Sequence, residues 1–314
     1  MPTLPPLSCS TITFRDRTLP RALDTIAGLG FHQVDLGALA GLCEHVPPRG
    51  TAAELATVAE QVRATSLTVT GVNADPGSFT TRADHTAVRE AMYRLLDFCA
   101  DVASPRLVLT CGEPEDHTIP AGEQLRRVAD GLEPVLGHAR ATGVELTVEA
   151  PHYLRLVNTM ARTTELLAAL APGITQAWDV SHVRASGEDP AELFPHFAGR
   201  VSTVHLRDAL PGDIRRPMGL GDIDFGRVLA AVESAGYRGP LVLELETHDS
   251  PFASKEEEVR SALSHLATAC SESTDRTGSA DRTEPAAPTA RAEPVIRTAP
   301  GAPAVSARPG GEVR

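Results

Sequence analysis

The sequence predicts an α/β protein folded as a (β/α)₈ TIM barrel, and three observations favour this fold. Short apolar runs alternate with longer segments of helical periodicity, as in proteins built from βα units. Eight such units fit within about 270 residues, a typical length for this barrel. The first run also lacks the glycine-rich phosphate turn that usually marks a doubly wound open sheet, the competing architecture.

The predicted strands are short and mostly apolar, as strands covered on both faces are. They cover residues 7–14, 32–38, 67–73, 106–111, 144–150, 174–180, 201–207 and 240–246. The predicted helices follow them one by one. They cover residues 19–30, 51–66, 85–103, 121–143, 162–171, 189–199, 224–236 and 254–270. Several end in glycine, which favours a C-cap, and Asp224 is placed to cap the seventh helix.

The chain divides into two regions by composition. Residues 1–270 contain the predicted barrel, whereas residues 271–314 lack aromatic residues and are rich in proline, alanine and arginine. A segment of that composition cannot bury enough apolar surface to offset its loss of entropy on folding, so we predict a disordered C-terminal tail. Acidic and arginine residues cancel in the tail, so the net charge of −12 belongs to the barrel.

Composition also limits the functions that the chain can have. Its acidic balance disfavours binding to nucleic acid. No apolar stretch is long enough to cross a membrane, and the N-terminus resembles no secretory signal. Five scattered cysteines indicate neither a disulfide framework nor a structural zinc site, so we expect a cytoplasmic protein. Lys255 is the only lysine and lies in a charged helical stretch, which disfavours Schiff-base chemistry.

Candidate site residues follow from the strand ends, because TIM-barrel active sites lie at the carboxyl ends of the strands. Glu149, Asp179, His205 and Glu244 lie among the last residues of the fifth to eighth predicted strands, about one βα unit apart. Three converging carboxylates would repel one another without a cation. The sequence therefore predicts a divalent metal site, for which Mn²⁺, Mg²⁺, Co²⁺ and Zn²⁺ are all compatible.

Each of these residues also has an ordinary structural explanation. An aspartate at a strand end is usually a helix N-cap, and a lone histidine in an apolar run is usually a hydrogen-bonded core group. The carboxylates could pair with the many arginines. We favour the metal site because the ordinary explanation needs four separate accidents at equivalent positions. Glu246 points to the same face as Glu244, one layer away, and is its alternative.

Several motifs together resemble the sugar phosphate isomerase/epimerase family of the xylose-isomerase-like TIM-barrel superfamily. They are LTVEAPH, WDVSHV, VHLRDA, GLGDIDF and GYRGPLVLELE, and the resemblance spans residues 7–269. It implies that Glu149, Asp179, His205 and Glu244 are the metal ligands, with Mn²⁺ as the first candidate. It also implies that His182 of the D-x-x-H motif, and His152, contact substrate. Arg216, rather than Arg215, is the arginine expected to bind substrate oxygens.

The function implied is isomerisation or epimerisation of a small, polyhydroxylated carbonyl compound through an enediolate. Glu149 and Glu244 would be the catalytic acid and base, one removing a proton and the other returning it. Relatives in this superfamily are often dimers or tetramers, so a homo-oligomer is expected. An inosose-type dehydratase at the same site is the alternative, and a non-catalytic sugar-binding barrel is a further one. An endonuclease IV-type nuclease is disfavoured, because the strand ends 34–38, 71–76 and 109–114 lack that group's extra histidines.

Overall fold

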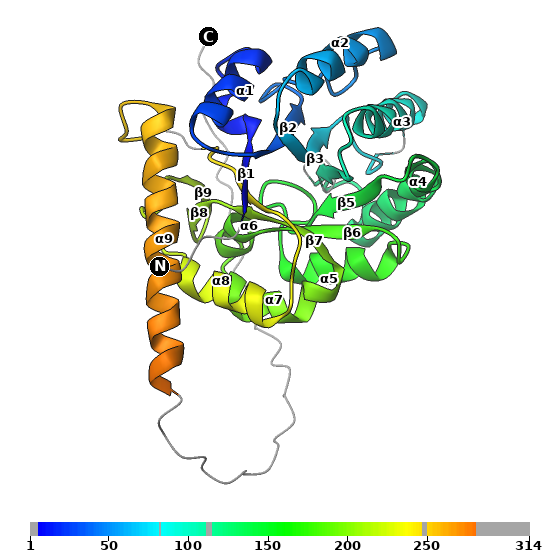
Figure 1. The fold of residues 1–314 in the computed structure, drawn as a ribbon. Helices are drawn as coiled ribbons and strands as arrows, with labels where there is room; N and C mark the ends of the chain where they lie inside the picture. Colours follow the sequence, from blue (N-terminus) through cyan, green and yellow to red (C-terminus); the bar gives the residue numbers. More distant parts are fainter. Residues whose placement is uncertain (1–5, 82, 111–114, 247–249, 281–314) are drawn as a thin grey trace, which may run out of the picture.

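The computed structural model describes residues 6–81, 83–110, 115–246 and 250–280. Eight parallel strands close into a barrel in the order β1-β10-β7-β6-β5-β4-β3-β2, which confirms the predicted fold. Figure 1 shows these strands in the middle of the molecule with the helices around them. The barrel strands are β1 (Leu7–Ser10), β2 (Gln33–Leu39), β3 (Thr68–Asp75), β4 (Arg106–Thr110), β5 (Glu145–Glu149), β6 (Thr175–Asp179), β7 (Val201–Leu206) and β10 (Leu241–Leu243).

Most of the helices cover the outside of the barrel, as Figure 1 shows. They are α1 (Leu19–Gly28), α2 (Ala52–Arg63), α3 (Thr86–Asp101), α4 (Ala121–Thr142), α5 (Met160–Ala169), α6 (Val180–Ala185), α7 (Pro190–Phe197), α8 (Phe225–Ser234) and α9 (Lys255–Ala280). The core lies between these two layers. Trp178 of β6, for example, packs on Phe194 and Phe197 of α7, with ring centroids 5.9 and 5.4 Å apart.

Three local elements differ from the predicted pattern. The first apolar run is only partly a strand, because β1 ends at Ser10 and the 3₁₀ helix η1 (Thr11–Phe14) follows. The short helix α6 starts directly after β6. The segment after β7 forms an antiparallel hairpin of β8 (Asp208–Leu210) and β9 (Asp213–Arg216), where a plain loop was expected. A second 3₁₀ helix, η2 (Ala198–Arg200), connects α7 to β7.

The carboxyl-terminal helix is longer than the sequence suggested. It packs along α8, as Figure 1 shows, and continues to Ala280, past the expected boundary at residue 270. Residues 281–314 lie outside the described part of the chain, so the tail remains a prediction. In the described part, no helix has the length and apolar character needed to cross a membrane.

Candidate active site at the carboxyl end of the barrel

The four predicted metal ligands lie together at the carboxyl ends of the strands, around an opening that we call the mouth. Glu149 ends β5 and Asp179 ends β6. His205 is the penultimate residue of β7, and Glu244 follows β10 directly. The strand register sets Asp179 level with His205, whereas Glu149 pairs with Ala177, two residues before Asp179. His205 pairs with Val242, two residues before Glu244. All four side chains are buried. We refer to these four residues as the polar cluster.

The imidazole of His205 lies between two carboxylates of the cluster. Its Nδ1 is 3.2 Å from Oε1 of Glu149 and 3.2 Å from Oε2 of Glu244. Asn73 of β3 donates from Nδ2 to the same oxygen of Glu244 at 3.5 Å. One ligand atom each from Glu149, Asp179 and His205 lie within 4.8 Å of one another. Three of the four cluster residues therefore offer oxygen and nitrogen ligand atoms close enough to hold one ion, and Glu244 is not among these three.

Asp179 is both the N-cap of the helix α6 and a member of the polar cluster. Its Oδ1 accepts the backbone N–H groups of Ser181 at 2.7 Å and His182 at 3.3 Å, which caps α6. It also accepts the Ser181 hydroxyl at 2.6 Å. The carboxylate is thus a helix N-cap through one oxygen, while the other oxygen, Oδ2, belongs to the polar cluster.

The two histidines expected to contact substrate border the cluster. The rings of His152 and His182 lie against each other, with centroids 4.1 Å apart. His152 Nε2 is 3.9 Å from Glu149 Oε2, and His182 Nε2 is 3.8 Å from Asp179 Oδ2. The backbone N–H of Tyr153 donates to His182 Nδ1 at 3.0 Å, and Nη2 of Arg207 lies 3.2 Å from His182 Nε2. Arginine can only donate, so these two contacts compete for the single acceptor nitrogen of a neutral ring. Burial lowers the pKa of both rings, that of His152 to about 3, so both are neutral.

A buried arginine, Arg207, completes the mouth, and sequence reasoning noted it without giving it a role. It follows β7 two residues after His205, and only 1% of its side chain is exposed. Its Nη2 donates to Asp179 Oδ2 at 3.0 Å and its Nη1 to Glu246 Oε2 at 2.8 Å. Glu246, the alternative to Glu244, thus pairs with the arginine, whereas Glu244 is the carboxylate beside His205. The arginine of the H-x-R-D sequence was the available signal, because alternate residues of a strand face the same side.

Asp208, the next residue, organises the segment that carries Arg216. Its Oδ2 accepts the backbone N–H groups of Gly219 at 2.8 Å and Gly221 at 2.9 Å. A Cβ at Gly221 would lie 2.1 Å from Asp208 Oδ1, so only glycine allows this approach. Arg216 itself lies on β9, is 44% exposed at its side chain and forms an ion pair with Asp213 at 2.8 Å. The expectation that it binds substrate therefore remains a prediction.

Burial and neighbouring charges shift the pKa values of the cluster residues in different directions. Burial raises the pKa of Glu244 to about 8, although the charges of His205 and Arg207 oppose it. Burial alone would lower the pKa of His205, but the carboxylates of Glu244 and Glu149 outweigh it and raise the pKa to about 10. Burial also opposes ionisation of Glu149, yet the contact with His205 at 3.2 Å holds its pKa well below the ordinary range. Asp179 behaves likewise, because the charge of Arg207 outweighs burial and lowers its pKa.

The cluster and its border also contain buried polar atoms that make no hydrogen bond. They are His205 Nε2, Nδ1 of the bordering His152, and the ion-paired atoms Glu149 Oε1 and His205 Nδ1, which lie 3.2 Å apart. Nearly all buried polar atoms in folded proteins are paired, so these atoms indicate a missing ligand. Divalent cations bind carboxylate oxygens and imidazole nitrogens directly. The residues present therefore fit a divalent metal, and this donor set does not choose among the four candidate ions.

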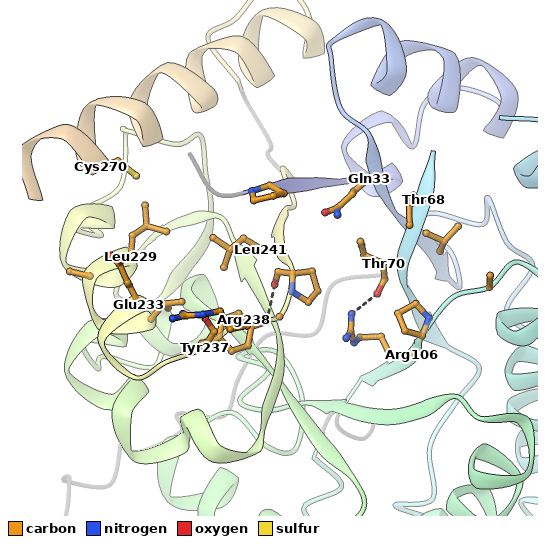
Figure 2. A pocket seen from close by; sticks show the side chains of 18 residues that line it. Gln33, Thr68, Thr70, Arg106, Leu229, Glu233, Tyr237, Arg238, Leu241 and Cys270 are labelled. Carbon is orange, nitrogen blue, oxygen red and sulfur yellow. Dashed lines mark hydrogen bonds between the residues drawn. The ribbon is translucent and has the colours of Figure 1, made fainter. Parts of the chain in front are cut away.

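A large cavity lies at the other end of the barrel and has a different character. Its volume is about 900 Å³, and Gln33, Thr68 and Arg106, which begin β2, β3 and β4, line it together with Tyr237 (Figure 2). Arg106 spans part of it by donating to the backbone oxygen of Thr70 at 2.6 Å. Of the described residues that line this cavity, none belongs to the polar cluster. Because TIM-barrel chemistry takes place at the carboxyl end, we place the candidate active site in the mouth.

The fold and the mouth together define a TIM-barrel protein with a buried cluster of residues that could hold a metal ion. A family described as "Xylose isomerase-like TIM barrel" matches residues 23–269. This match covers most of the chain, and the protein therefore belongs to the xylose isomerase-like TIM barrel family. The resemblance inferred from the sequence motifs is confirmed.

Individual relatives carry names of sugar epimerases. L-ribulose-5-phosphate 3-epimerase UlaE of Escherichia coli O157:H7 (strain EC4115 / EHEC) is 28% identical over 168 residues, which are 52% of this chain and 58% of that protein. The matched region thus spans less than two thirds of that relative. The structure of protein SMc04130 from Sinorhizobium meliloti 1021 superposes with a TM-score of 0.69 at 25% identity, covering 85% of this chain and 99% of that one.

A further solved structure shares the fold at lower identity. The IOLI protein, described with a binding zinc atom, superposes with a TM-score of 0.69 at 18% identity, covering 85% of this chain and 99% of that one. At this identity the likeness shows a common fold, and the zinc atom is a property of that protein.

Proposed function

We propose that this protein is a divalent-metal-dependent isomerase or epimerase of a small, sugar-like carbonyl compound. The observation that carries the proposal is the pair of carboxylates, Glu149 and Glu244, which flank His205 with one oxygen each at 3.2 Å from its Nδ1. Two carboxylates beside one buried centre are what a reaction needs when one group removes a proton and another returns it.

The metal would be held by the polar cluster, with Mn²⁺ as the first candidate and Mg²⁺, Co²⁺ or Zn²⁺ as the others. When bound, a divalent ion withdraws electron density from a substrate carbonyl and so acidifies the neighbouring C–H group. The atoms of Glu149 and His205 that make no hydrogen bond support this assignment. Asp179 would contribute Oδ2, because its other oxygen, Oδ1, caps α6.

The proton transfers belong to Glu149 and Glu244. One carboxylate removes the proton beside the carbonyl, which yields an enediolate, and the other delivers a proton to the same carbon or to its neighbour. Return to the same carbon gives an epimer, and return to the neighbour gives an isomer. His182 and His152, whose ring centroids are 4.1 Å apart, would contact substrate oxygens beside the cluster, and Arg216 would bind further substrate oxygens.

The named relatives support this substrate class. UlaE is an L-ribulose-5-phosphate 3-epimerase, and one structure of the same fold is titled L-ribulose 3-epimerase, with a TM-score of 0.70 at 18% identity over 89% of this chain and 99% of that one. Both names describe proton exchange beside a ketose carbonyl. We carry only this reaction class to the present chain, because the sequence match covers 58% of UlaE.

Deuterium exchange tests the proposal. The purified protein, after elemental analysis of its metal, is incubated in D₂O with ketoses, ketose phosphates and inososes, and the products are followed by NMR. We expect deuterium at the carbon beside the carbonyl, and we expect Glu149→Gln and Glu244→Gln each to lower incorporation by at least about 100-fold, the usual scale for a general acid or base.

Glu145→Gln is the matched control, because Glu145 begins the strand that Glu149 ends and pairs with Arg106 at 3.4 Å. It should exchange at the unaltered rate. Undiminished exchange in both site variants would contradict the proposal. Loss of water from an inosose would instead identify the dehydratase alternative, and tight sugar binding without any exchange would identify a binding protein.

Other expectations from the sequence belong to the same proposal. We propose a small-molecule partner, no nucleic acid or membrane partner, a cytoplasmic location and assembly into a homo-dimer or homo-tetramer. The acidic charge of −12 supports the expectation about nucleic acid. Light scattering of the purified full chain would measure the assembly.

A further inference from the structure

Arg207 is connected to the polar cluster by a closed set of hydrogen bonds. Its Nε donates to Ser181 Oγ at 2.9 Å, and that hydroxyl in turn donates to Asp179 Oδ1 at 2.6 Å. Its Nη2 donates to the other carboxylate oxygen, Oδ2, at 3.0 Å. Both oxygens of Asp179 are therefore held by one buried guanidinium, directly on one side and through a hydroxyl on the other.

The second branch of the same guanidinium reaches a different strand. Nη1 donates to Glu246 Oε2 at 2.8 Å and lies 3.9 Å from Glu244 Oε1. Arg207 follows β7, so it connects the end of β6 on one side to the segment after β10 on the other. An arginine can do this because its planar fork carries five donors in a fixed geometry, and it stays charged even when buried.

Two effects of this arginine on a bound metal oppose each other. As a positive charge near the cluster, it repels a divalent cation and weakens binding. As the partner that orients Asp179, it keeps a ligand in the rotamer that the ion needs, and loss of such a partner typically weakens metal binding 10- to 100-fold. Because Asp179 also caps α6 through Oδ1, an unheld carboxylate would turn toward that helix.

We propose that Arg207 is a positioning residue for the metal site, which holds Asp179 in its ligating orientation, and that this effect outweighs its charge repulsion. The inference rests on the proposed function, since it assumes that the cluster binds a divalent ion. It assigns a role to the arginine of the H-x-R-D sequence that the four ligands alone leave unexplained.

Metal affinity, measured on the full chain by titration of Mn²⁺ into chelator-treated protein, tests the direction of the effect. Arg207→Met keeps the length of the side chain and removes both its charge and its fork, and we expect binding about 10- to 100-fold weaker than in the unaltered protein. Arg207→Lys keeps the charge and one donor and should recover part of this loss. Ser181→Ala removes only the hydroxyl bridge and should weaken binding several-fold in a protein that retains the ion pair.

Arg227→Met is the control, because Arg227 forms an ion pair with Asp189 at the surface, with 54% of its side chain exposed. It should bind Mn²⁺ as the unaltered protein does. Equal or tighter binding by Arg207→Met would overturn the positioning role and leave the metal site intact. Should Arg207→Met fail to fold, unchanged affinity in both Ser181→Ala and Arg207→Lys would overturn it equally. If the unaltered protein binds neither Mn²⁺ nor Zn²⁺, this result contradicts both the proposed function and the inference about Arg207.

Discussion

At the scale of single residues, Asp35 shows how the barrel interior treats a charge away from the mouth. It lies on β2, is 1% exposed and accepts the Ser10 hydroxyl at 3.0 Å. A Cβ at Gly71 would approach its Oδ2 to 2.9 Å, so the glycine leaves room for this carboxylate. Burial raises the pKa of Asp35 to about 6, although His205 and the Ser10 hydroxyl oppose the shift. The folded protein therefore prefers Asp35 protonated.

This shift predicts a pH dependence of stability. A carboxyl group whose pKa is raised from 3.8 to about 6 stabilises the fold fully below pH 3.8, and that contribution is lost as the pH rises through 6. Asp35→Asn cannot ionise. Its free energy of unfolding relative to the unaltered protein should therefore improve by roughly 3 kcal/mol between pH 4 and 7, at about 1.4 kcal/mol per pKa unit.

Urea unfolding with a chelator present, at several pH values, measures this difference. Asp24→Asn, at an exposed position of α1, is the control and should show a pH-independent difference. A constant difference for Asp35→Asn as well would contradict the raised pKa.

At the scale of elements, the β8–β9 hairpin and the glycine segment after it depend on one buried carboxylate. Asp208, 1% exposed, accepts four backbone N–H groups through its two oxygens. They belong to Ala209, Gly219, Gly221 and Ile223. A carboxylate can accept at both oxygens, whereas an amide presents an N–H₂ group in place of one of them. The fold of this segment is therefore decided by a side chain that lies before it in the chain.

Asp208→Asn should destabilise the protein by about 3 kcal/mol, because buried N–H groups would face another donor. Amides of the segment 217–223 should also exchange with solvent faster than in the unaltered protein. Urea unfolding and hydrogen-exchange mass spectrometry measure the two effects. Asp213→Asn, which breaks only the partly exposed ion pair with Arg216, should cost less than about 1 kcal/mol. Similar costs for the two variants would contradict the proposed role of Asp208.

At the scale of the whole molecule, an ion in the mouth would connect four neighbouring strands of the closed barrel. The ligands come from β5, β6, β7 and the residue after β10. In the metal-free protein the carboxylates raise the pKa of His205 to about 10, against the effect of burial, so the ring carries a proton near neutral pH. A metal needs the deprotonated nitrogen, and its binding must therefore release that proton.

Two consequences are measurable. Mn²⁺ at about 100 times its dissociation constant should stabilise the folded protein by about 2.7 kcal/mol and raise the melting temperature, and a chelator should reverse this. Affinity should rise as the pH increases from 7 toward 10. Calorimetry in buffers of different ionisation enthalpy would count the released proton. His205→Ala should lose the stabilisation, and retained stabilisation would contradict ligation by this residue.

The success and the failure of the sequence prediction have physical causes at particular residues. The barrel strands were predicted because strands covered on both faces are continuous apolar runs. The hairpin was not predicted, because β8 and β9 have only three and four residues and their form depends on Asp208. The helix α6 was not predicted either, because it begins inside the apolar run that ends at Val180 and has only six residues. Glu149, Asp179, His205 and Glu244 were predicted as neighbours because each stands at a strand end.

The sequence alone determined the barrel and the four polar residues at its carboxyl end. Both follow from periodicity along the chain, and parallel strands in a barrel end at the same edge whatever their side chains. The tertiary structure alone decided the hydrogen bonds of those residues. Arg207 donates to Asp179 and Glu246, and Asn73 donates to Glu244. Atoms of Glu149 and His205 are left without a hydrogen bond. Such contacts join atoms from different strands within about 3 Å. They depend on the register of the closed barrel and on side-chain rotamers, and spacing along the chain contains neither.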